Sequence, residues 1–406
     1  MAMKVRALLS TVAVLIAMSL TGCGHYTCGT TFGNANCTSS GGGITQGGGG
    51  TGGGLVAFTY FTDFSTNGQG SAGTALQVLD QSAGTYTPIS AFVPPTVPLF
   101  PTGIVIVGKQ FAYIPSADST LYSFTIDPTT GFYTDIGLNP LSVIGGDSIA
   151  ASASGKFLFI GDTGTQQISA YSVNADGSLT VVSGSPFATG GVSPRVMATD
   201  GQSKFLYVTA GIGSTAIAAL SIGSSGALTS VGTPLISNVS SIAADPSGKF
   251  LLGVSWQNGD NTIHLYSINS STGALTAAGS TVTSGTPRNI AIHPNGQWVY
   301  TFSEDPVLVE QEAVEGFDFD SNTGVLTNMS GSPFTSIIAN GGAIEQSGQF
   351  LFGLGLTLQP GGLLNTITPY SIDSSTGELA VWPPGVDASA AFPSIDEAAF
   401  AATDAP

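Results

Sequence analysis

The sequence repeats itself seven times between Leu55 and its C-terminus, and this repetition constrains the fold more than any other feature. One anchor is a turn followed by an aromatic residue, and neighbouring copies lie 45–53 residues apart, at Phe58, Phe111, Phe157, Phe205, Phe250, Trp298 and Phe350. A second anchor is a turn glycine, and its copies lie 46–53 residues apart, at Gly84, Gly131, Gly177, Gly226, Gly273, Gly324 and Gly377. A fixed period of this length is typical of repeat architectures such as propellers and solenoids.

Each copy divides into four short apolar segments that predict β-strands. In the fifth copy these are SSIAAD, KFLLGVS, TIHLYSI and ALTAAG, with Pro, Ser, Gly, Asn and Thr at the turns between them. The 56 glycines and the charged fraction of only 8% disfavour long helices. The pattern therefore predicts an all-β, seven-bladed β-propeller with four-stranded antiparallel blades.

The two ends of the repeat region predict how the ring closes. The first copy begins directly at its second strand, LVAFTYF, without an innermost strand before it. The C-terminal PSIDEAAFAATDAP resembles an innermost strand with nothing after it. We expect the C-terminal strand to complete the first blade, so that residues 55–406 form one closed propeller.

The N-terminus has the features of a targeting segment. Lys4 and Arg6 precede an apolar stretch at 7–18, and Leu20-Thr21-Gly22-Cys23 resembles the lipobox of bacterial lipoproteins. Residues 1–22 are therefore expected to be a signal peptide and Cys23 to carry a lipid that anchors the protein to a membrane. Gly24 after the cysteine favours the outer over the inner membrane of a cell envelope. The alternative is an ordinary secretory signal with a chance cysteine.

Residues 23–54 are expected to form a tether between the lipid and the propeller. The run GGGITQGGGGTGGG at 41–54 is typical of a flexible coil. Cys28 and Cys37 are expected to pair as a disulfide in an oxidising envelope. A metal pair is the weaker alternative, because only His25 stands nearby.

The net charge of −17 excludes one class of partner. Such an acidic surface repels phosphate backbones, so nucleic acid is not expected. A monomer without cofactor is expected.

The blade motifs resemble a known family. The pattern PR-x-x-A-x-x-P-x-G, the element YSI-D/N-S-x-TG-x-L and the tetrapeptide GSPF at 184–187 and 331–334 are similar to the bacterial lactonase-type seven-bladed β-propellers. That family includes the propeller form of 6-phosphogluconolactonase. The resemblance places Arg288 and Glu304 at family positions for polar site residues, while Asn289 stands where the family has His.

The two arginines that follow the signal peptide are the main candidate site residues. Arg195 and Arg288 each follow a proline that opens an innermost strand, where both are expected to face the central funnel. There they could hold a carboxylate or phosphate. The alternative is that each pairs with an acid, such as Asp147 or Glu304, and only joins blades. Asp147, Trp256 and Asp260 are further candidates for ligand binding.

The remaining polar residues are expected to be structural. His293 belongs to a repeated hairpin turn, and His264 lies in a third strand. The four lysines of the propeller, Lys109, Lys156, Lys204 and Lys249, all occupy the hairpin between first and second strands and are expected to be solvated. The acidic stretch 303–316 could bind Ca²⁺, but it lacks the regular ligand spacing, and no metal site is expected.

Two functional hypotheses follow from the sequence. The first is an envelope lipoprotein whose propeller binds or scaffolds a protein or glycan partner. The second is a hydrolase of a sugar lactone or other cyclic ester. In that hydrolase Arg195 and Arg288 would hold the anion, and Glu304 would activate water.

Overall fold

The computed structural model describes residues 37–39, 44–46, 56–63, 73–81, 83–88, 101–137, 141–211, 213–304, 313–335, 341–345, 347–359, 362–382, 390–392 and 398–404. The expected signal peptide, Cys23, Cys28, the side chain of Cys37 and the acidic loop 305–312 lie outside what is described. In the described part of the tether, β1 (Cys37–Ser39) pairs with β2 (Ile44–Gln46). The three residues of β2 interrupt the glycine-rich sequence of residues 41–54. Within the described residues no helix is long and apolar enough to cross a membrane.

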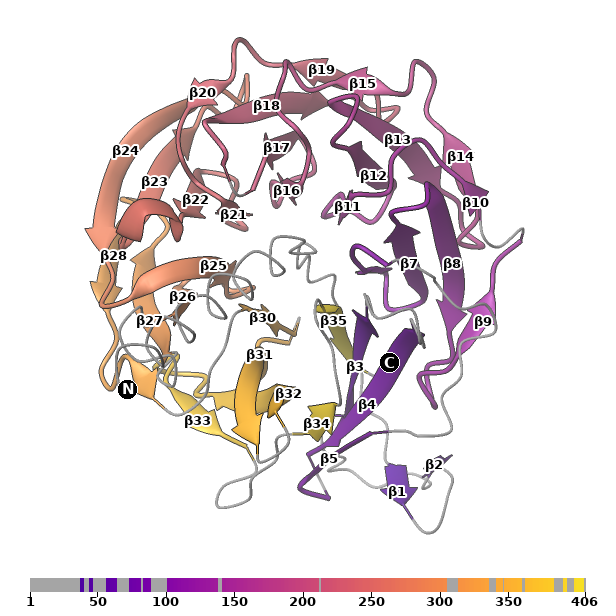
Figure 1. Cartoon of the computed structure of the whole chain (residues 1–406), viewed down its shortest axis with the longest axis vertical. Coiled ribbons are helices and arrows are strands. Elements are labelled where there is room, and N and C mark those ends of the chain that lie inside the picture. Colours follow the sequence, from indigo (N-terminus) through magenta and orange to yellow (C-terminus); the bar gives the residue numbers. More distant parts are fainter. Residues whose placement is uncertain are drawn as a thin grey trace, which may run out of the picture.

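Seven antiparallel sheets form a ring (Figure 1), which confirms the predicted propeller. Blade 1 contains β35 (Ala398–Asp404), β3 (Val56–Asp63), β4 (Gly73–Asp80) and β5 (Thr85–Pro88). Blade 2 contains β6 (Val105–Val107), β7 (Phe111–Ser116), β8 (Thr120–Ile126), β9 (Tyr133–Asp135) and β10 (Leu141–Ser142). Blade 3 contains β11 (Ser148–Ala151), β12 (Phe157–Asp162), β13 (Gln167–Val173), β14 (Leu179–Val181) and β15 (Phe187–Ala188).

The next blades continue around the ring in chain order. Blade 4 contains β16 (Val196–Thr199), β17 (Phe205–Thr209), β18 (Ala216–Ile222), β19 (Leu228–Ser230) and β20 (Leu235–Ile236). Blade 5 contains β21 (Ser241–Ala244), β22 (Phe250–Val254), β23 (Thr262–Ile268) and β24 (Leu275–Val282). Blade 6 contains β25 (Thr286–Ile292), β26 (Trp298–Glu304), β27 (Ala313–Asp320), β28 (Val325–Asn328) and β29 (Phe334–Thr335). Blade 7 contains β30 (Gly341–Ile344), β31 (Phe350–Gln359), β32 (Gly362–Ile372), β33 (Leu379–Val381) and β34 (Ala390–Phe392).

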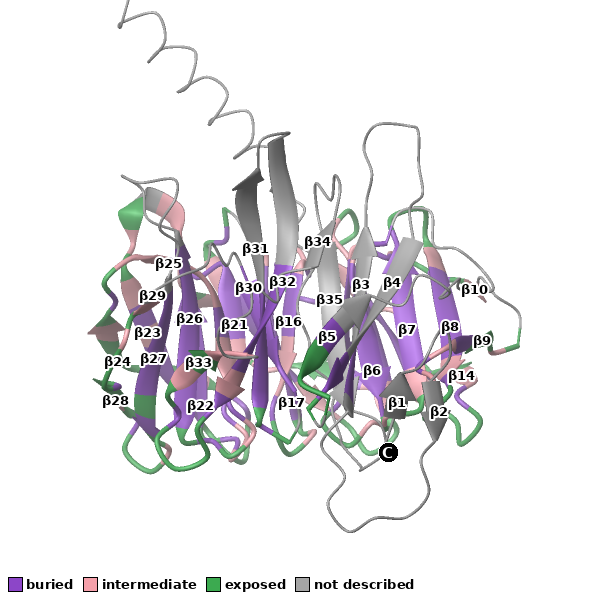
Figure 2. Cartoon of the chain, turned by 90° about the horizontal axis from the view of Figure 1, so that it is seen from below, coloured by how far each residue is buried: buried purple, intermediate pink, exposed green. Residues whose placement is uncertain are grey.

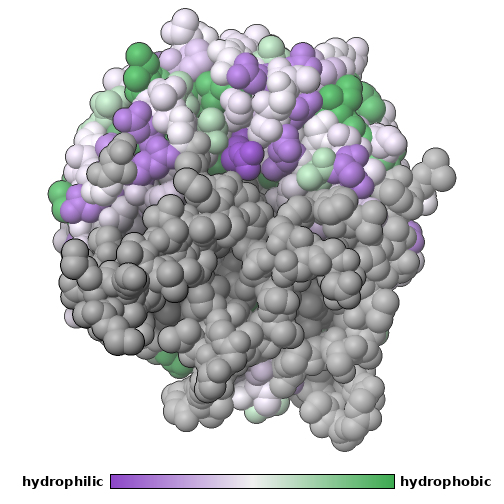
Figure 3. All heavy atoms as spheres, viewed as in Figure 1, coloured by the Kyte–Doolittle hydropathy of each residue, from purple (hydrophilic) through white to green (hydrophobic). Residues whose placement is uncertain are grey.

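The outermost strand of most blades is divided into two short pieces. In blade 3, β14 pairs with residues 171–173 of β13 while β15 pairs with residues 167–168 of the same strand. Blades 2, 4, 6 and 7 show the same division. Four large hydrophobic residues on the described outermost strands are exposed, namely Val181, Ile236, Val282 and Val325. In Figure 3 hydrophobic residues lie as separate groups near the edge of the visible face. Isolated exposed hydrophobic residues are normal on a protein surface.

The C-terminal strand closes the ring, as the sequence predicts. β35 pairs antiparallel with β3 along its whole length, from Ala57 opposite Asp404 to Asp63 opposite Ala398. Blade 1 thus joins the two ends of the propeller. Because the ring is closed, each blade lies between two neighbouring blades.

The hydrophobic core lies between the blades, and the two repeat anchors meet there. Buried clusters fill the described interfaces from blades 1 and 2 around to blades 6 and 7. A Cβ atom placed on Gly273 would lie 2.6 Å from Cε1 of Phe205 in the preceding blade. The same contact joins Gly177 to Phe111 and Gly377 to Trp298. These turn glycines, and likewise Gly226 and Gly324, therefore pack against the anchor aromatic of the preceding blade, whereas Gly84 does not. The described strands of the blades are largely buried, and these parts are purple in Figure 2.

Tyrosines reinforce four of these interfaces. The hydroxyl groups donate hydrogen bonds of 2.7–3.1 Å to the carbonyl oxygen of a turn glycine in the next blade. The pairs are Tyr60 with Gly131, Tyr113 with Gly177, Tyr207 with Gly273, and Tyr300 with Gly377. A buried hydroxyl group needs such a partner, and the bond fixes the spacing between blades.

A polar side chain caps the hairpin between first and second strands in several blades. His293 occupies this position in blade 6, where Nδ1 accepts a hydrogen bond of 3.1 Å from Asn295 N and Nε2 lies 2.9 Å from Gly348 O. This confirms His293 as a turn residue, and burial lowers its pKa. In blade 7, Glu345 accepts hydrogen bonds from the backbone of Ser347 and Phe350, and burial raises its pKa to about 7.

Candidate functional site

The propeller has two different faces, which are called here the mouth face and the hairpin face. The mouth face carries the connections between blades and the loops between second and third strands, such as 163–166 and 255–261. The hairpin face carries the turns between first and second strands, such as 152–156 and 245–249. Innermost strands run from the mouth face to the hairpin face.

Arg288 lies at the mouth face and is held against an aromatic ring. The register of β25 and β26 shifts between Pro287 and Asn289, so Arg288 is the extra residue of a β-bulge. Bulges re-aim a side chain relative to a regular strand. The guanidinium carbon of Arg288 lies 4.9 Å from the centre of the Trp256 ring, in cation–π geometry. Trp256 precedes the short 3₁₀ helix η1 (Gln257–Gly259) of blade 5, so the pair joins blades 5 and 6.

Glu304 ends the strand that pairs with the beginning of β25. In the register of this pair, Glu304 lies opposite Thr286 and Ser303 lies opposite Pro287. The backbone therefore brings Glu304 and Arg288 to the same end of two adjacent strands at the mouth face. The orientation of the Glu304 side chain lies outside what is described.

Arg195 occupies the corresponding position two blades away. It precedes β16, and the atoms nearest to a Cβ placed on Gly211 include Arg195 Cδ at 3.3 Å and Cγ at 3.6 Å. The aliphatic part of the side chain thus packs over the loop that follows β17 in its own blade. Whether Arg195, Arg288 and Glu304 serve one ligand stays a prediction.

The other three sequence candidates have assigned contacts. Asp147 Oδ2 accepts hydrogen bonds of 2.7 Å from both the backbone N and Oγ1 of Thr163, which fixes the mouth loop of blade 3. Trp256 uses one face of its ring for Arg288. Asp260 Oδ2 lies 2.9 Å from Nε2 of His264. Their roles in ligand binding remain predictions.

The Asp260–His264 pair is a feature that sequence reasoning missed. Both side chains are partly exposed, at 27% and 35%, and they lie four positions apart on a loop and the strand that follows it. The D-x-x-x-H spacing was the available signal, but it identifies a pair only when the loop folds back onto the strand. Within the residues that the structure describes, no three His, Cys, Asp or Glu side chains gather closely enough to hold a metal ion.

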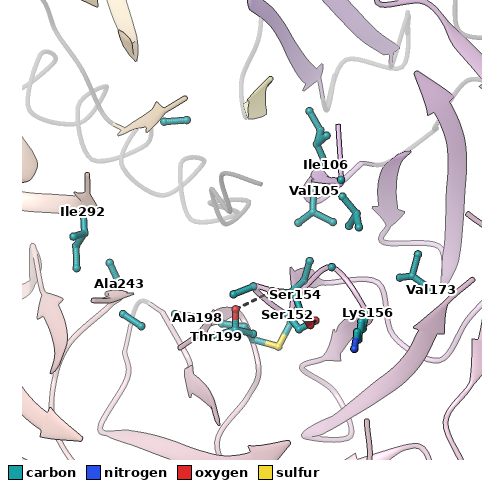
Figure 4. Close-up of a pocket in the computed structure, with 18 of the residues that line it drawn as sticks. Val105, Ile106, Ser152, Ser154, Lys156, Val173, Ala198, Thr199, Ala243 and Ile292 are labelled. Atoms are coloured by element: carbon teal, nitrogen blue, oxygen red, sulfur yellow. Dashed lines mark hydrogen bonds between the residues drawn. The ribbon is translucent and has the colours of Figure 1, made fainter. Parts of the chain in front are cut away.

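A cavity of about 650 Å³ occupies the centre of the ring (Figure 4). Its described walls come from the innermost strands β6, β16, β21, β25 and β30, from the end of β11 and from the hairpin that follows β11. Gly108, Phe111 and residues 173–175 of blades 2 and 3 complete its hairpin end. The residues that line it include neither Arg195 nor Arg288, but Asn289 directly follows Arg288. The cavity therefore lies on the hairpin side of the arginines.

Comparisons with known proteins agree with this architecture. The family model described as "Lactonase, 7-bladed beta-propeller" matches residues 118–239 and 148–336. No curated protein matches the sequence.

Solved structures share the fold at low sequence identity. A candidate 6-phosphogluconolactonase of Bacteroides uniformis is 18% identical, with a TM-score of 0.63 over 85% of this chain and 99% of its own. A second, from Bacteroides fragilis, is 16% identical, with a TM-score of 0.62 over 85% of this chain and 98% of its own. A periplasmic gluconolactonase of Pseudomonas aeruginosa is 16% identical, with a TM-score of 0.53 over 76% of this chain and 94% of its own. At these identities the likeness shows the fold alone.

Proposed function

Because this chain belongs to the lactonase family of seven-bladed β-propellers, we propose that it hydrolyses a lactone at the mouth face. The observation that carries the proposal is the family match over residues 118–336. This range contains the blades that present Arg195, Trp256 and Arg288. The names of the similar structures point to a sugar lactone as the substrate class.

The reaction requires few groups from the protein. Water adds to the lactone carbonyl, negative charge develops on the carbonyl oxygen, and the ring C–O bond then breaks to release a hydroxy acid. A fixed cation beside the carbonyl oxygen stabilises that charge, and a carboxylate takes the proton of the attacking water and returns it to the ring oxygen as the C–O bond breaks. In the proposed site Arg288 supplies the cation, Glu304 supplies the carboxylate and Arg195 holds an anionic group of the substrate.

The geometry around Arg288 supports this assignment. The bulge at Arg288 turns the residue out of the regular strand, and the Trp256 ring limits the positions of its guanidinium group. Preorganised charges of this kind lose little free energy to reorganisation during the reaction. We assign Trp256 the role of positioning Arg288, because one ring face is already used for that contact.

The comparisons favour this hydrolase over the binding surface that was the first hypothesis from the sequence. The description of the family model and the names of these similar structures refer to lactonases, and they support a reaction more directly than a scaffold. Asn289, which stands where the family motif has His, has structural hydrogen bonds in this chain. Its Oδ1 accepts hydrogen bonds from Ser241 Oγ and from Ile290 N.

We also propose that the enzyme works at the cell envelope, anchored by a lipid on Cys23. The lipobox-like sequence before this cysteine supports the proposal. Expression of the full chain and of the Cys23→Ala variant with a labelled fatty acid tests it. Label and membrane association should both be lost in the variant, and equal labelling of the two proteins would contradict the anchor.

Lactone hydrolysis itself can be followed by proton release. Glucono-1,5-lactone and its 6-phosphate are assayed at constant pH, with the spontaneous rate subtracted. Arg288→Ala is expected to lower kcat/KM by about 100-fold, the loss typical of removing one preorganised donor to an oxyanion. Lys204→Ala, an exposed residue of the hairpin face, is the matched control and should keep the wild-type rate. Turnover of both lactones at the spontaneous rate by the wild-type protein would refute the proposal.

A further inference from the structure

The described walls of the central cavity differ in charge from the rest of the molecule. The whole chain has 25 acidic and 8 basic residues. Among the described residues that line the cavity, however, Lys156 is the only charged side chain and no acid is present. An anion that the surface repels would therefore meet a favourable charge here.

The walls of the cavity are largely aliphatic. Ala198, Ala243 and Ile292 point toward it from three different innermost strands, and Val105 and Ile106 line it from blade 2 (Figure 4). The first three are only partly buried, so that a ligand can reach them. A volume of about 650 Å³ falls within the range of small-molecule sites, which are lined mainly by apolar side chains with a few polar groups.

Most of the polar groups that line the cavity lie at its hairpin end, whereas Asn289 lies toward the mouth face. Its lining from β11 begins only at Ala151 and continues through the hairpin 152–156, where Ser152, Ser154 and Lys156 lie together (Figure 4). Lys156 is exposed, so its ammonium group can meet a ligand without prior desolvation. The described lining of the cavity is thus mainly aliphatic in the ring and cationic at its hairpin end.

We propose that this cavity is a binding site for an aliphatic carboxylate. The alkyl chain of the ligand lies inside the propeller ring, and its carboxylate lies beside Lys156. The site is separate from the arginines of the mouth face, and it does not depend on the proposed lactone hydrolysis. It also gives Lys156 a role that the other hairpin lysines lack, since Lys204 and Lys249 do not line the cavity.

Calorimetric titration with decanoate tests the proposal, with decanol as the uncharged probe. Decanoate should bind the wild-type protein with saturation at one site. Lys156→Ala should weaken decanoate about fivefold, the limit for an exposed ion pair, and Lys156→Glu should weaken it further. Decanol should bind the wild type and Lys156→Ala equally. Lys204→Ala, the same repeat position in the next blade, is the control and should bind decanoate like the wild type.

A second kind of variant tests where the alkyl chain of the ligand binds. Ala243→Leu adds three carbon atoms to the cavity wall and should weaken decanoate and decanol alike. If this variant does not fold, the decanoate affinities of the lysine variants alone test the proposal. Absence of saturable decanoate binding at millimolar concentration, or equal affinities for Lys156→Ala, Lys156→Glu and Lys204→Ala, would overturn the proposal. Lactone hydrolysis by the lysine variants should stay at the wild-type rate, which separates this site from the mouth face.

Discussion

The contact between repeat anchors makes a quantitative prediction for the Gly273→Ala substitution. Gly273 has a φ of +79°, a conformation that costs an alanine about 1 kcal/mol. A Cβ atom at this position would also lie 2.6 Å from Cε1 and 2.8 Å from Cγ of Phe205, whose side chain is buried. Because the buried Phe205 side chain would have to shift to make room for the added Cβ atom, overpacking adds about 2 kcal/mol. We expect the free energy of unfolding to fall by about 3 kcal/mol in total.

Gly84→Ala is the matched control at the same repeat position. Gly84 has a φ of +66°, but a Cβ atom there would meet nothing within 4 Å. It should therefore lose only the backbone contribution, about 1 kcal/mol. Urea unfolding followed by tryptophan fluorescence measures both variants.

A double-mutant cycle isolates the contact itself. Phe205→Leu should destabilise the wild-type protein but cost less in the Gly273→Ala background, with a coupling of about 1–2 kcal/mol. Equal losses for Gly273→Ala and Gly84→Ala, together with zero coupling, would refute the argument that the anchors hold neighbouring blades together.

Three further predictions concern the site and the pH dependence. Trp256→Leu should lower kcat for lactone hydrolysis about tenfold. Trp256→Phe should lower it much less, since the weaker cation–π contact of a phenyl ring still positions Arg288. Equal losses of kcat in the two variants would argue against a positioning role. Glu304→Gln should lower kcat and flatten the acid limb of the pH–rate profile, and an unchanged profile would remove Glu304 as the base. The pKa of Glu345 is about 7 in the folded protein, whereas the ordinary pKa of a glutamate is 4.5. Its protonated form therefore stabilises the fold below pH 4.5, and this contribution is lost as the pH rises through 7. Glu345→Gln should therefore abolish up to about 3 kcal/mol of pH-dependent stability across that window, as measured by urea unfolding at several pH values.

The candidate site was only partly predictable from the sequence. The position of Arg288 after Thr-Pro at the start of an innermost strand placed it at the mouth face, because strand order and direction follow from the repeat. Its contact with Trp256 did not follow, since the two residues belong to different blades and the bulge at Arg288 has no obvious sequence signal. Asp260 and His264 were read separately because their pairing depends on how the η1 loop turns back.

The sequence by itself determined the architecture, because each repeat contains the local signals for its own strands and turns. Phe205 and Gly273 could each be recognised as an anchor without knowledge of the other, and the unmatched C-terminal strand specified the closure with β3. Only the tertiary structure decided that these two anchors touch, that Arg288 lies against Trp256, and that Lys156 is the one lysine among the described residues that line the central cavity. The physical reason is that periodicity constrains backbone paths, whereas contacts between blades depend on side-chain directions and on the curvature of the closed ring.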